Sequence, residues 1–192
     1  MANVDASFGF RPVAADGNGG SRIKLGRYAI AAAEGTDLFR GDPVLIAGTS
    51  VLDELTGTYV PTVARAGTSG YVTGVIVDFE PQTDESLTYK TDATTERFIL
   101  VADDPYQLFE VQADGSLAVT DIGNTADIIF TNAGSTVTGQ SGAELDTADI
   151  GTGNQLVIEG ITMKPKRNDL DSANPVALVR FNLHQKRYTT GV

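Results

Sequence analysis

The chain has 192 residues, a length that allows one domain or two small ones with a buried core. It contains no cysteine, which excludes disulfides and thiolate metal sites, and its abundance of Gly, Thr, Val, Ala and Asp over Leu, Lys and Glu favours an all-β fold. No apolar stretch reaches the roughly 18 residues that a membrane helix needs, and the N-terminus lacks the charged and apolar regions of a secretory signal.

The net charge of −11 is unevenly distributed along the chain. Residues 41–160 contain nineteen acidic and three basic side chains, a charge of −16, whereas residues 1–40 and 161–192 together carry +5. An acidic body repels nucleic acid, so we expect no nucleic-acid partner. The basic ends are suited to meeting an acidic surface, although ordinary solubilising charge produces the same pattern.

Residues 1–40 are predicted to form an N-terminal arm and an edge strand. In the arm, Pro12 restrains Arg11 to an extended conformation, and the aromatic residues Phe8 and Phe10 come just before it. Two aromatic side chains on an extended arm are unfavourable in water. They are therefore expected to pack either on the core of this chain or on a neighbouring subunit.

The edge strand is expected around residues 22–27, after a glycine-rich loop at 16–20. Polar and apolar residues alternate there, so Arg22 and Lys24 should point outward from the edge. Under this interpretation, deletion of residues 1–15 leaves the body of the protein folded and removes only the contacts of the arm.

The stretch 41–81 predicts an antiparallel unit against which the rest of the chain packs. Three apolar runs, at 42–47, 59–64 and 71–79, are separated by glycines. In the third run, β-branched and aromatic residues alternate with period two, which is typical of a strand.

The remaining patterns predict short strands joined by turns. The expected elements are a doubly buried strand at 98–102, a turn at 103–105, a strand at 108–112, a hairpin turn at 113–116, a strand at 127–131, one helical turn at 141–146, and strands at 155–163 and 175–184.

These elements predict an all-β fold: a small β-barrel or β-sandwich with an extended N-terminal arm and a loop-rich insertion at 123–153. The β body spans residues 41–192, either as one unit or as two subdomains, 41–122 and 123–192.

No residues form a recognisable catalytic, cofactor-binding or metal-binding pattern. His184 is the sole histidine, and the sequence identifies no serine and acid partners for it and no other nitrogen or sulfur ligand for zinc. Asp103 and Asp104 precede Pro105, an arrangement more typical of a turn than of a calcium site. We therefore predict that the protein is not an enzyme and acts through its surfaces.

Several segments resemble the head decoration, or cement, proteins of tailed bacteriophages. The segments are MANVDASFGFRPV, GTDLFRGDPV, GYVTGVIVDFEP, RFILVADDPYQLFEVQ, TGQSGAELD and VRFNLHQKRYTTGV, and they follow one another in the order of that family. Apart from TGQSGAELD, the part at 123–153 matches it poorly.

The resemblance implies a structural virion protein, made in the bacterial cytoplasm, that coats the outer surface of an icosahedral capsid. Such proteins commonly bind as trimers over capsomer junctions and clamp neighbouring major capsid subunits, so the expected partners are the major capsid protein and further copies of this chain, with no membrane. The residues expected to contact the capsid or another subunit are basic or aromatic residues near the two ends: Phe8, Phe10, Arg11, Arg22, Lys24, Arg180, His184, Lys186, Arg187 and Tyr188.

Three other functions remain open at this point. One is a carbohydrate-binding β-sandwich, although the chain has no tryptophan and only six tyrosines to form a sugar platform. The second is another virion surface or fibre component. The third is a hydrolase that uses two carboxylates, for which the acidic middle offers too many candidates to nominate a pair.

Overall fold

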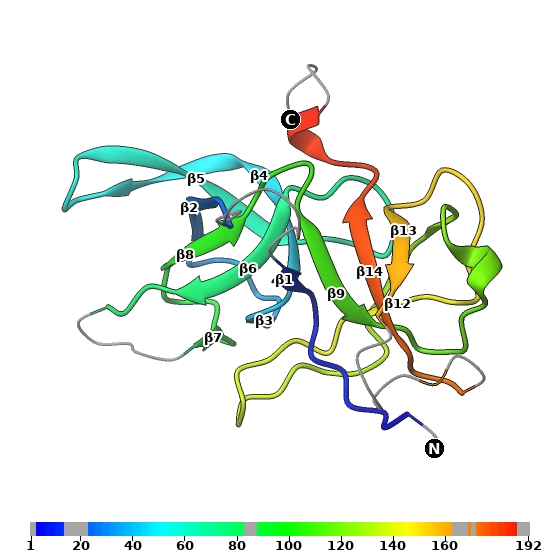
Figure 1. The fold of residues 1–192 in the computed structure, drawn as a ribbon. Coiled ribbons are helices and arrows are strands. Elements are labelled where there is room, and N and C mark those ends of the chain that lie inside the picture. The colour runs from blue at the N-terminus through cyan, green and yellow to red at the C-terminus, as the bar shows by residue number, and fades with distance from the viewer. Residues whose placement is uncertain (1–2, 14–22, 83–87, 163–168, 170–171, 188–192) are drawn as a thin grey trace.

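The computed structural model describes residues 3–13, 23–82, 88–162, 169 and 172–187, and the fold of these parts is all-β, as predicted. Figure 1 shows two β units side by side, a barrel and a five-stranded sheet. Two short 3-10 helices accompany the strands, η1 at Val119–Asp121 and η2 at Gln185–Arg187.

Five strands form the closed barrel in the order β2-β5-β4-β6-β8. Their bounds are Leu25–Ile30 for β2, Pro43–Asp53 for β4, Thr58–Arg65 for β5, Gly74–Phe79 for β6 and Arg97–Ala102 for β8. All neighbouring pairs are antiparallel except β2 and β5, which are parallel where they meet. The strands predicted at 42–47, 59–64, 71–79 and 98–102 are therefore all present. A two-stranded sheet of β3 (Leu38–Phe39) and β7 (Tyr89–Lys90) lies beside the barrel.

The strand predicted at the edge is instead a member of the barrel. β2 pairs along its whole length with β8, and Ala29 and Ile30 pair with β5 on the other side. Tyr28, Ala29 and Ile30 are buried. The prediction of an edge strand was wrong because alternation identifies the apolar side of a strand but not the number of its neighbours.

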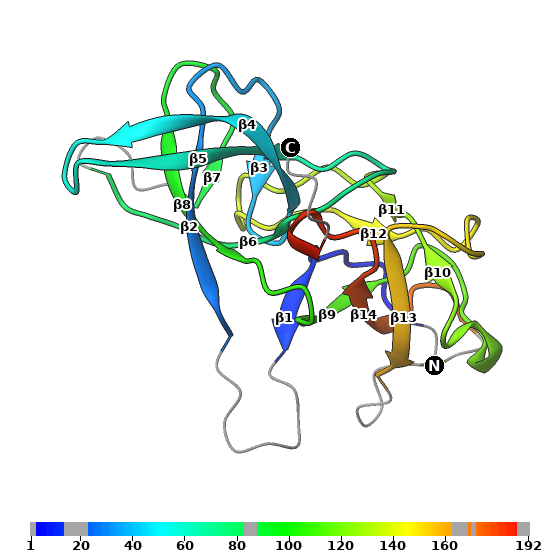
Figure 2. The ribbon, with the colours of Figure 1, turned by 90° about the horizontal axis from the view of Figure 1, so that it is seen from above.

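β4 and β5 extend beyond the barrel as a two-stranded ribbon. The register between them shifts between Ile46 and Ser50, and pairing then continues from Ser50 to Asp53. Figures 1 and 2 both show this part of the hairpin projecting away from the rest of the molecule. We call residues 48–60 the ribbon.

The second β unit is a five-stranded antiparallel sheet in the order β1-β9-β14-β13-β10. The bounds are Arg11–Val13 for β1, Leu108–Gln112 for β9, Thr125–Ala126 for β10, Leu156–Ile161 for β13 and Val176–Phe181 for β14. A small hairpin of β11 (Ile128–Ile129) and β12 (Glu144–Leu145) completes the unit. The helical turn predicted at 141–146 was wrong, because these residues lead into β12.

The N-terminal segment is part of the second unit rather than a free arm. β1 is antiparallel to β9, and Phe10 is only 2% exposed. Its ring centroid lies 5.8 Å from that of Phe181 and 6.4 Å from that of Phe109. Of the two alternatives for Phe10, packing on the core of this chain is the one observed.

The division between the two units does not follow the expected subdomain boundary. β9 lies before residue 122 but pairs with β1 and β14 of the second unit. The barrel ends with β8, so the division falls between Ala102 and Leu108. The expected arm at 1–40 is likewise divided, because β1 belongs to the sheet and β2 to the barrel.

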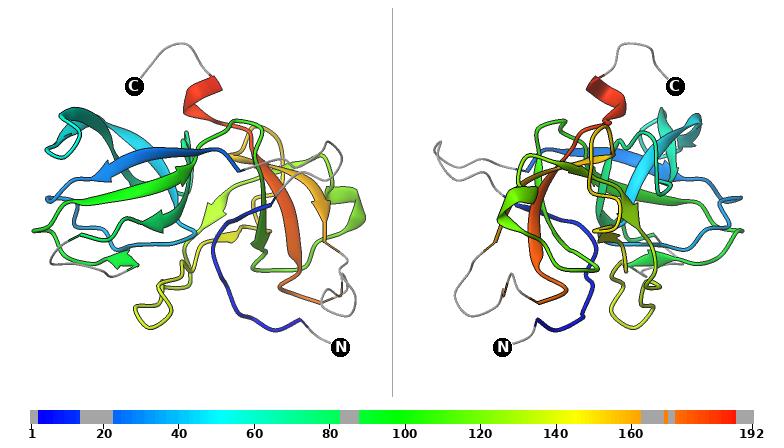
Figure 3. Two further views of the ribbon diagram at one scale, coloured as in Figure 1. Left: turned by 60° about the vertical axis from the view of Figure 1, so that its left-hand side comes forward. Right: turned by 90° about the vertical axis from the view of Figure 1, so that its right-hand side faces the viewer.

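The two units are joined by backbone bridges from three places. Arg40 pairs with Gln140, Val72 pairs with His184, and the amide of Phe10 donates to the carbonyl of Gly41 at 2.9 Å. Figure 3 shows the chain passing between the units in two further views. Among the residues described, no helix has the length and apolar character needed to cross a bilayer.

Candidate interaction surfaces

The outer face of the ribbon is apolar and exposed. Leu52 lies directly opposite Tyr59 in the register of β4 and β5, so their side chains share one face. They are 42% and 68% exposed, and Leu55 in the connecting turn is 95% exposed. Val60, which points to the other face, is buried. Three large apolar side chains on a projecting hairpin form a patch that is typical of a protein contact site.

The turn end of the ribbon is held to the barrel by Arg27. Its guanidinium donates to Asp53 Oδ2 at 2.6 Å, donates to both oxygens of Glu80 at 2.8–3.0 Å, and lies 4.3 Å from the ring centroid of Phe98. Hydrogen bonds from the Thr56 hydroxyl and from Arg27 hold the pKa of Asp53 below its ordinary value. The ribbon is therefore braced at its turn, which presents the apolar face in one orientation.

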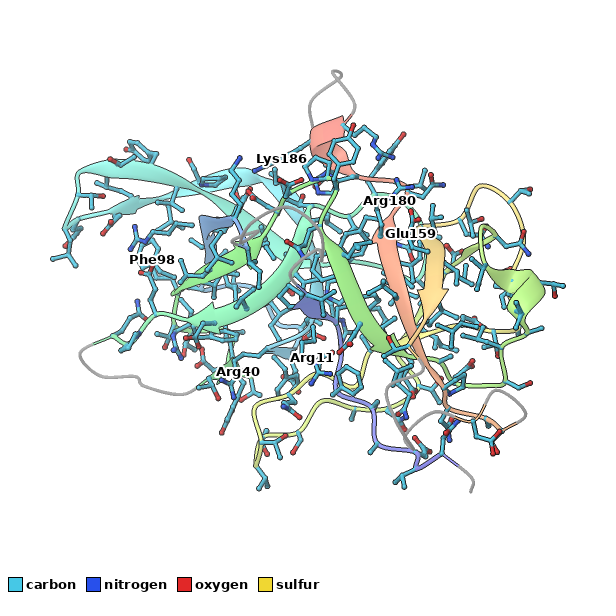
Figure 4. All side chains as sticks on the ribbon, in the orientation of Figure 1. Arg11, Arg40, Phe98, Glu159, Arg180 and Lys186 are labelled. Carbon is cyan, nitrogen blue, oxygen red and sulfur yellow. The ribbon has the colours of Figure 1, made fainter. Side chains whose placement is uncertain are left out.

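A second surface is a hollow of about 320 Å³ where the N-terminal segment crosses the barrel. We call it the seam hollow. Its wall includes Phe8, Phe10, Arg11, Arg40, Val77 and Gln140. Figure 4 shows Arg11 and Arg40 on the same side of the molecule.

A third surface surrounds η2, which follows the last strand. Lys186 donates to Asp103 Oδ2, which also accepts the hydroxyl of Tyr28 at 2.8 Å. The Lys186 ammonium lies 5.4 Å from the Tyr28 ring centroid. These contacts fasten the segment after β14 to the barrel strand β2.

His184 lies beneath this surface and is fully buried. Its Nδ1 accepts the backbone amide of Lys186 at 3.1 Å, and burial lowers the pKa of the imidazole to about 4. The residue is therefore a neutral structural histidine at neutral pH.

Two of the predicted contact residues are inside the molecule. Phe10 belongs to the aromatic core, and His184 is enclosed between the barrel and the sheet, so neither presents a surface to a partner. Both predictions were wrong for the same reason: the sequence showed aromatic and polar character but not the neighbours that cover it.

The other predicted contact residues fall into three groups. Three are exposed: Arg11, Lys24 and Lys186. Three are half-buried: Phe8, Arg180 and Arg187. Two lie outside the described residues: Arg22 and Tyr188. Figure 4 shows Arg11 well separated from Lys186, so the basic residues of the two ends do not form one patch.

Most of these cations already have a partner within the chain. Arg11 bonds to Glu110, Arg180 bonds to Glu159 at 2.7 Å, and Arg187 lies 5.2 Å from the ring centroid of Tyr106. A side chain with such a partner contributes less to binding, because forming a new contact breaks an existing one.

Sequence reasoning missed the ribbon and Arg40. One signal for the ribbon was available, since Leu52, Leu55 and Tyr59 lie in and beside a polar turn segment, VLDELTGTY, where no neighbouring element was expected to bury them. No sequence signal identified Arg40, because its place beside Arg11 depends on two segments that meet only in the fold.

Among the described residues, three carboxyl groups have raised pKa values, a property that a hydrolase would need in its catalytic acid. Burial is the main cause for Asp42, Asp127 and Glu144, and the pKa of Asp42 is about 6. Each accepts a hydrogen bond from a protein group, and none of the three lines the seam hollow. They are structural groups in their present surroundings.

Within the described part of the chain, no group of three or more histidine, cysteine or acidic side chains is arranged to hold a metal ion. Comparison of the chain with protein-family models, with curated protein sequences and with solved structures yields no match.

Proposed function

We propose that this protein is a structural component of a virion that binds the outer surface of an icosahedral phage capsid and clamps neighbouring major capsid subunits. The observation that carries the proposal is the braced ribbon with its exposed outer face of Leu52, Leu55 and Tyr59. The kind of partner comes from the resemblance of six segments of the sequence to capsid decoration proteins. The protein would be made in the bacterial cytoplasm and would perform no reaction.

The ribbon suits a clamp for a geometric reason. At about 3.3 Å per residue, the six residues from 48 to 53 give the ribbon a length of about 20 Å along which a neighbouring subunit can pack. Its free backbone edges also allow it to add a strand to a neighbouring sheet. Within the described residues, β4 and β5 pair only with each other from Ser50 to Asp53 and from Thr58 to Pro61.

Symmetry would make a weak contact sufficient. A trimer that engages three subunits gains from effective concentration, so each ribbon needs only modest affinity. Burial of Leu52, Leu55 and Tyr59 would add about 25 cal/mol for each Å² of apolar area removed from water. We therefore propose a homotrimer whose ribbons each contact a major capsid subunit.

The direct test is co-sedimentation with capsids that lack this protein. The variant Leu52→Ser, Leu55→Ser, Tyr59→Ser should lose capsid binding while its melting temperature stays close to that of the unmodified protein. A matched control carries Val119→Ser and Val137→Ser, which remove exposed apolar side chains away from the ribbon. The control should sediment with capsids, and bound protein should raise the melting temperature of the capsid.

Two results would count against the proposal in different ways. If the unmodified protein does not sediment with capsids, capsid binding is wrong. If it does and the triple variant binds equally well, the ribbon is not the contact. A mass measurement of the purified protein in solution checks the trimer separately.

A further inference from the structure

The seam hollow combines an apolar wall with two guanidinium groups. Phe8 and Val77 supply apolar surface, and Arg11 and Arg40 line the same hollow from different segments of the chain. The protein carries a net charge of −11, so two arginines together at one hollow stand out from their surroundings.

The backbone of Arg40 is held by hydrogen bonds, but its side-chain donors lack good acceptors. Its backbone amide donates to Gly139 at 3.0 Å, and its carbonyl accepts from Ser141 at 2.8 Å. In the side chain, Nη2 lies 3.5 Å from the Thr138 carbonyl, which is long for a hydrogen bond, and Nε is buried without a hydrogen-bond partner among the described residues. A buried donor of this kind is unfavourable for folding unless a ligand supplies an acceptor for it.

Arg11 provides a second donor group at the same hollow. Its Nε and Nη2 both contact Glu110 Oε2, and its guanidinium lies 5.0 Å from the ring centroid of Phe8. The side chain is still 62% exposed, so part of the fork remains open to solvent. Because Glu110 balances one of the two arginines, the hollow keeps about one positive charge, that of Arg40.

We propose that the seam hollow binds a carboxylate side chain, together with an adjacent apolar side chain, from the capsid subunit that this protein clamps. The inference rests on the proposed function for the identity of the partner. The carboxylate would accept hydrogen bonds from the side-chain donors of Arg40, and the exposed amide of Gln140 would donate a further one. The apolar neighbour would pack against Phe8 and Val77. Arginine suits this contact because its planar fork matches a carboxylate with two parallel hydrogen bonds.

The hollow itself is tested without any capsid. N-acetyl-L-leucine carries one carboxylate and one apolar side chain, and N-acetyl-L-leucinamide is its neutral counterpart. Titration of the full chain with N-acetyl-L-leucine should shift the NMR signals of Gly41, Val77 and the Arg40 Nε–H, and the amide should not. The variant Arg40→Gln should abolish the shifts, whereas Arg65→Gln, which removes a charge outside the hollow, should retain them. Equal shifts with the two compounds, or none with either, would overturn the proposal.

Capsid binding provides the second readout. Arg40→Gln should weaken capsid binding by about 10- to 100-fold, the range expected for hydrogen bonds to a charged group, while Arg65→Gln should have little effect. Arg40→Gln should leave the melting temperature unchanged within about 2 °C or raise it, because it removes an unsatisfied buried donor. A clear fall in melting temperature would show that Arg40 is structural.

The outcomes separate this inference from the proposed function. If the unmodified protein binds capsids and Arg40→Gln binds equally well, the hollow is not a capsid contact although the clamp stands. If the unmodified protein ignores capsids while N-acetyl-L-leucine shifts the hollow signals, the carboxylate site stands and its assignment to a capsid subunit is wrong.

Discussion

Ser141 donates a hydrogen bond of 2.5 Å to the Oδ1 atom of Asp42, although the two residues are 99 positions apart and belong to different β units. The second oxygen of Asp42 accepts the backbone amide of Phe39 at 2.7 Å. Asp42 is 2% exposed, and burial raises the pKa of its carboxyl group to about 6. This pair joins the start of the barrel strand β4 to the segment that leads into β12.

The first prediction concerns Asp42 and acid. Its carboxyl group holds a proton more strongly in the folded protein than in the unfolded one, where the pKa is near 3.8, so its contribution to stability rises as the pH falls from about 6 to about 3.8. In Asp42→Asn this gain is lost, because the amide does not titrate. Between pH 7 and pH 4.5 the variant should lose about 2 kcal/mol of unfolding free energy relative to the unmodified protein, measured by urea denaturation. Asn fits the site, since its oxygen can accept from Phe39 and its amide can donate to Ser141. Equal pH dependence of the two proteins would contradict a raised pKa.

The second prediction has the opposite sign. His184 has a folded pKa of about 4 against an ordinary value of 6.5, so the unfolded chain takes up the proton first and stability falls as the pH drops through this range. The variant His184→Asn keeps an acceptor for the Lys186 amide and does not titrate. Relative to the unmodified protein, the unfolding free energy of this variant should increase by about 2 kcal/mol as the pH falls from 7 to 4.5. Because Asp42 and His184 act in opposite directions over the same window, their effects nearly cancel, and the double variant should show a pH dependence close to that of the unmodified protein. A steep loss of unfolding free energy in the double variant relative to the unmodified protein would contradict this pair of shifts.

The third prediction replaces the expectation that the N-terminal segment is dispensable for folding. Phe10→Ala should lower the unfolding free energy by about 3–5 kcal/mol, because it leaves a cavity against Phe109 and Phe181. Deletion of residues 1–15 should likewise abolish cooperative unfolding, since it removes β1 from the sheet edge. Urea denaturation measures both changes. The unfolding is monitored by far-ultraviolet circular dichroism, because the chain has no tryptophan for fluorescence. An intact, cooperative transition in the deletion variant would mean that β1 is not required.

The fourth prediction concerns Gly74, where β6 begins beside β8. A Cβ atom at this position would lie 2.3 Å from the Ala102 carbonyl oxygen and 2.8 Å from Cγ1 of Val101, so Gly74→Ala forces the strands apart. The expected loss is about 1–3 kcal/mol, as for other overpacked sites. Gly35→Ala is the matched control, because a Cβ there meets no atom within 4 Å and its φ is not positive. Thermal denaturation of the two variants should show a large difference, and similar melting temperatures would argue against close packing at this corner.

The fifth prediction tests the bracing of the ribbon. Arg27→Gln removes the contacts to Asp53, Glu80 and Phe98, so the ribbon should move more freely while the barrel remains folded. Hydrogen exchange should become faster at residues 50–60 and stay unchanged in β13 and β14. Arg180→Gln, which breaks one surface pair with Glu159, serves as the control and should leave ribbon exchange unaffected. Faster exchange throughout the molecule would instead indicate general destabilisation.

Much of the local structure could be predicted from the sequence. The apolar runs at 98–102, 108–112 and 175–184 are strands β8, β9 and β14, and the buried positions Ala177, Val179 and Phe181 alternate as period two requires. The pattern failed at 141–146, because this segment is too short to distinguish a helical periodicity from that of a strand. Its conformation is decided by the pairing of β12 with β11.

The candidate interaction surfaces were harder to predict from the sequence than the strands were. Basic and aromatic residues near the chain ends were predicted as contacts, yet Phe10 and His184 are core residues and Arg180 is paired. Leu52 and Tyr59 were not nominated, although both belong to the polar turn segment VLDELTGTY, the one local signal for the ribbon. Their exposure follows from the projection of the ribbon beyond the barrel.

The sequence by itself determined that the chain is all-β and where most of its strands lie, because alternation and glycine placement act over a few neighbouring residues. Only the tertiary structure decided which strands pair, because hydrophobic periodicity gives a strand an apolar face but does not specify which element packs against that face. That is why β2 closes a barrel, why Phe10 lies in the core, and why Arg40 and Arg11 meet at one hollow: each depends on contacts between segments that are distant along the chain.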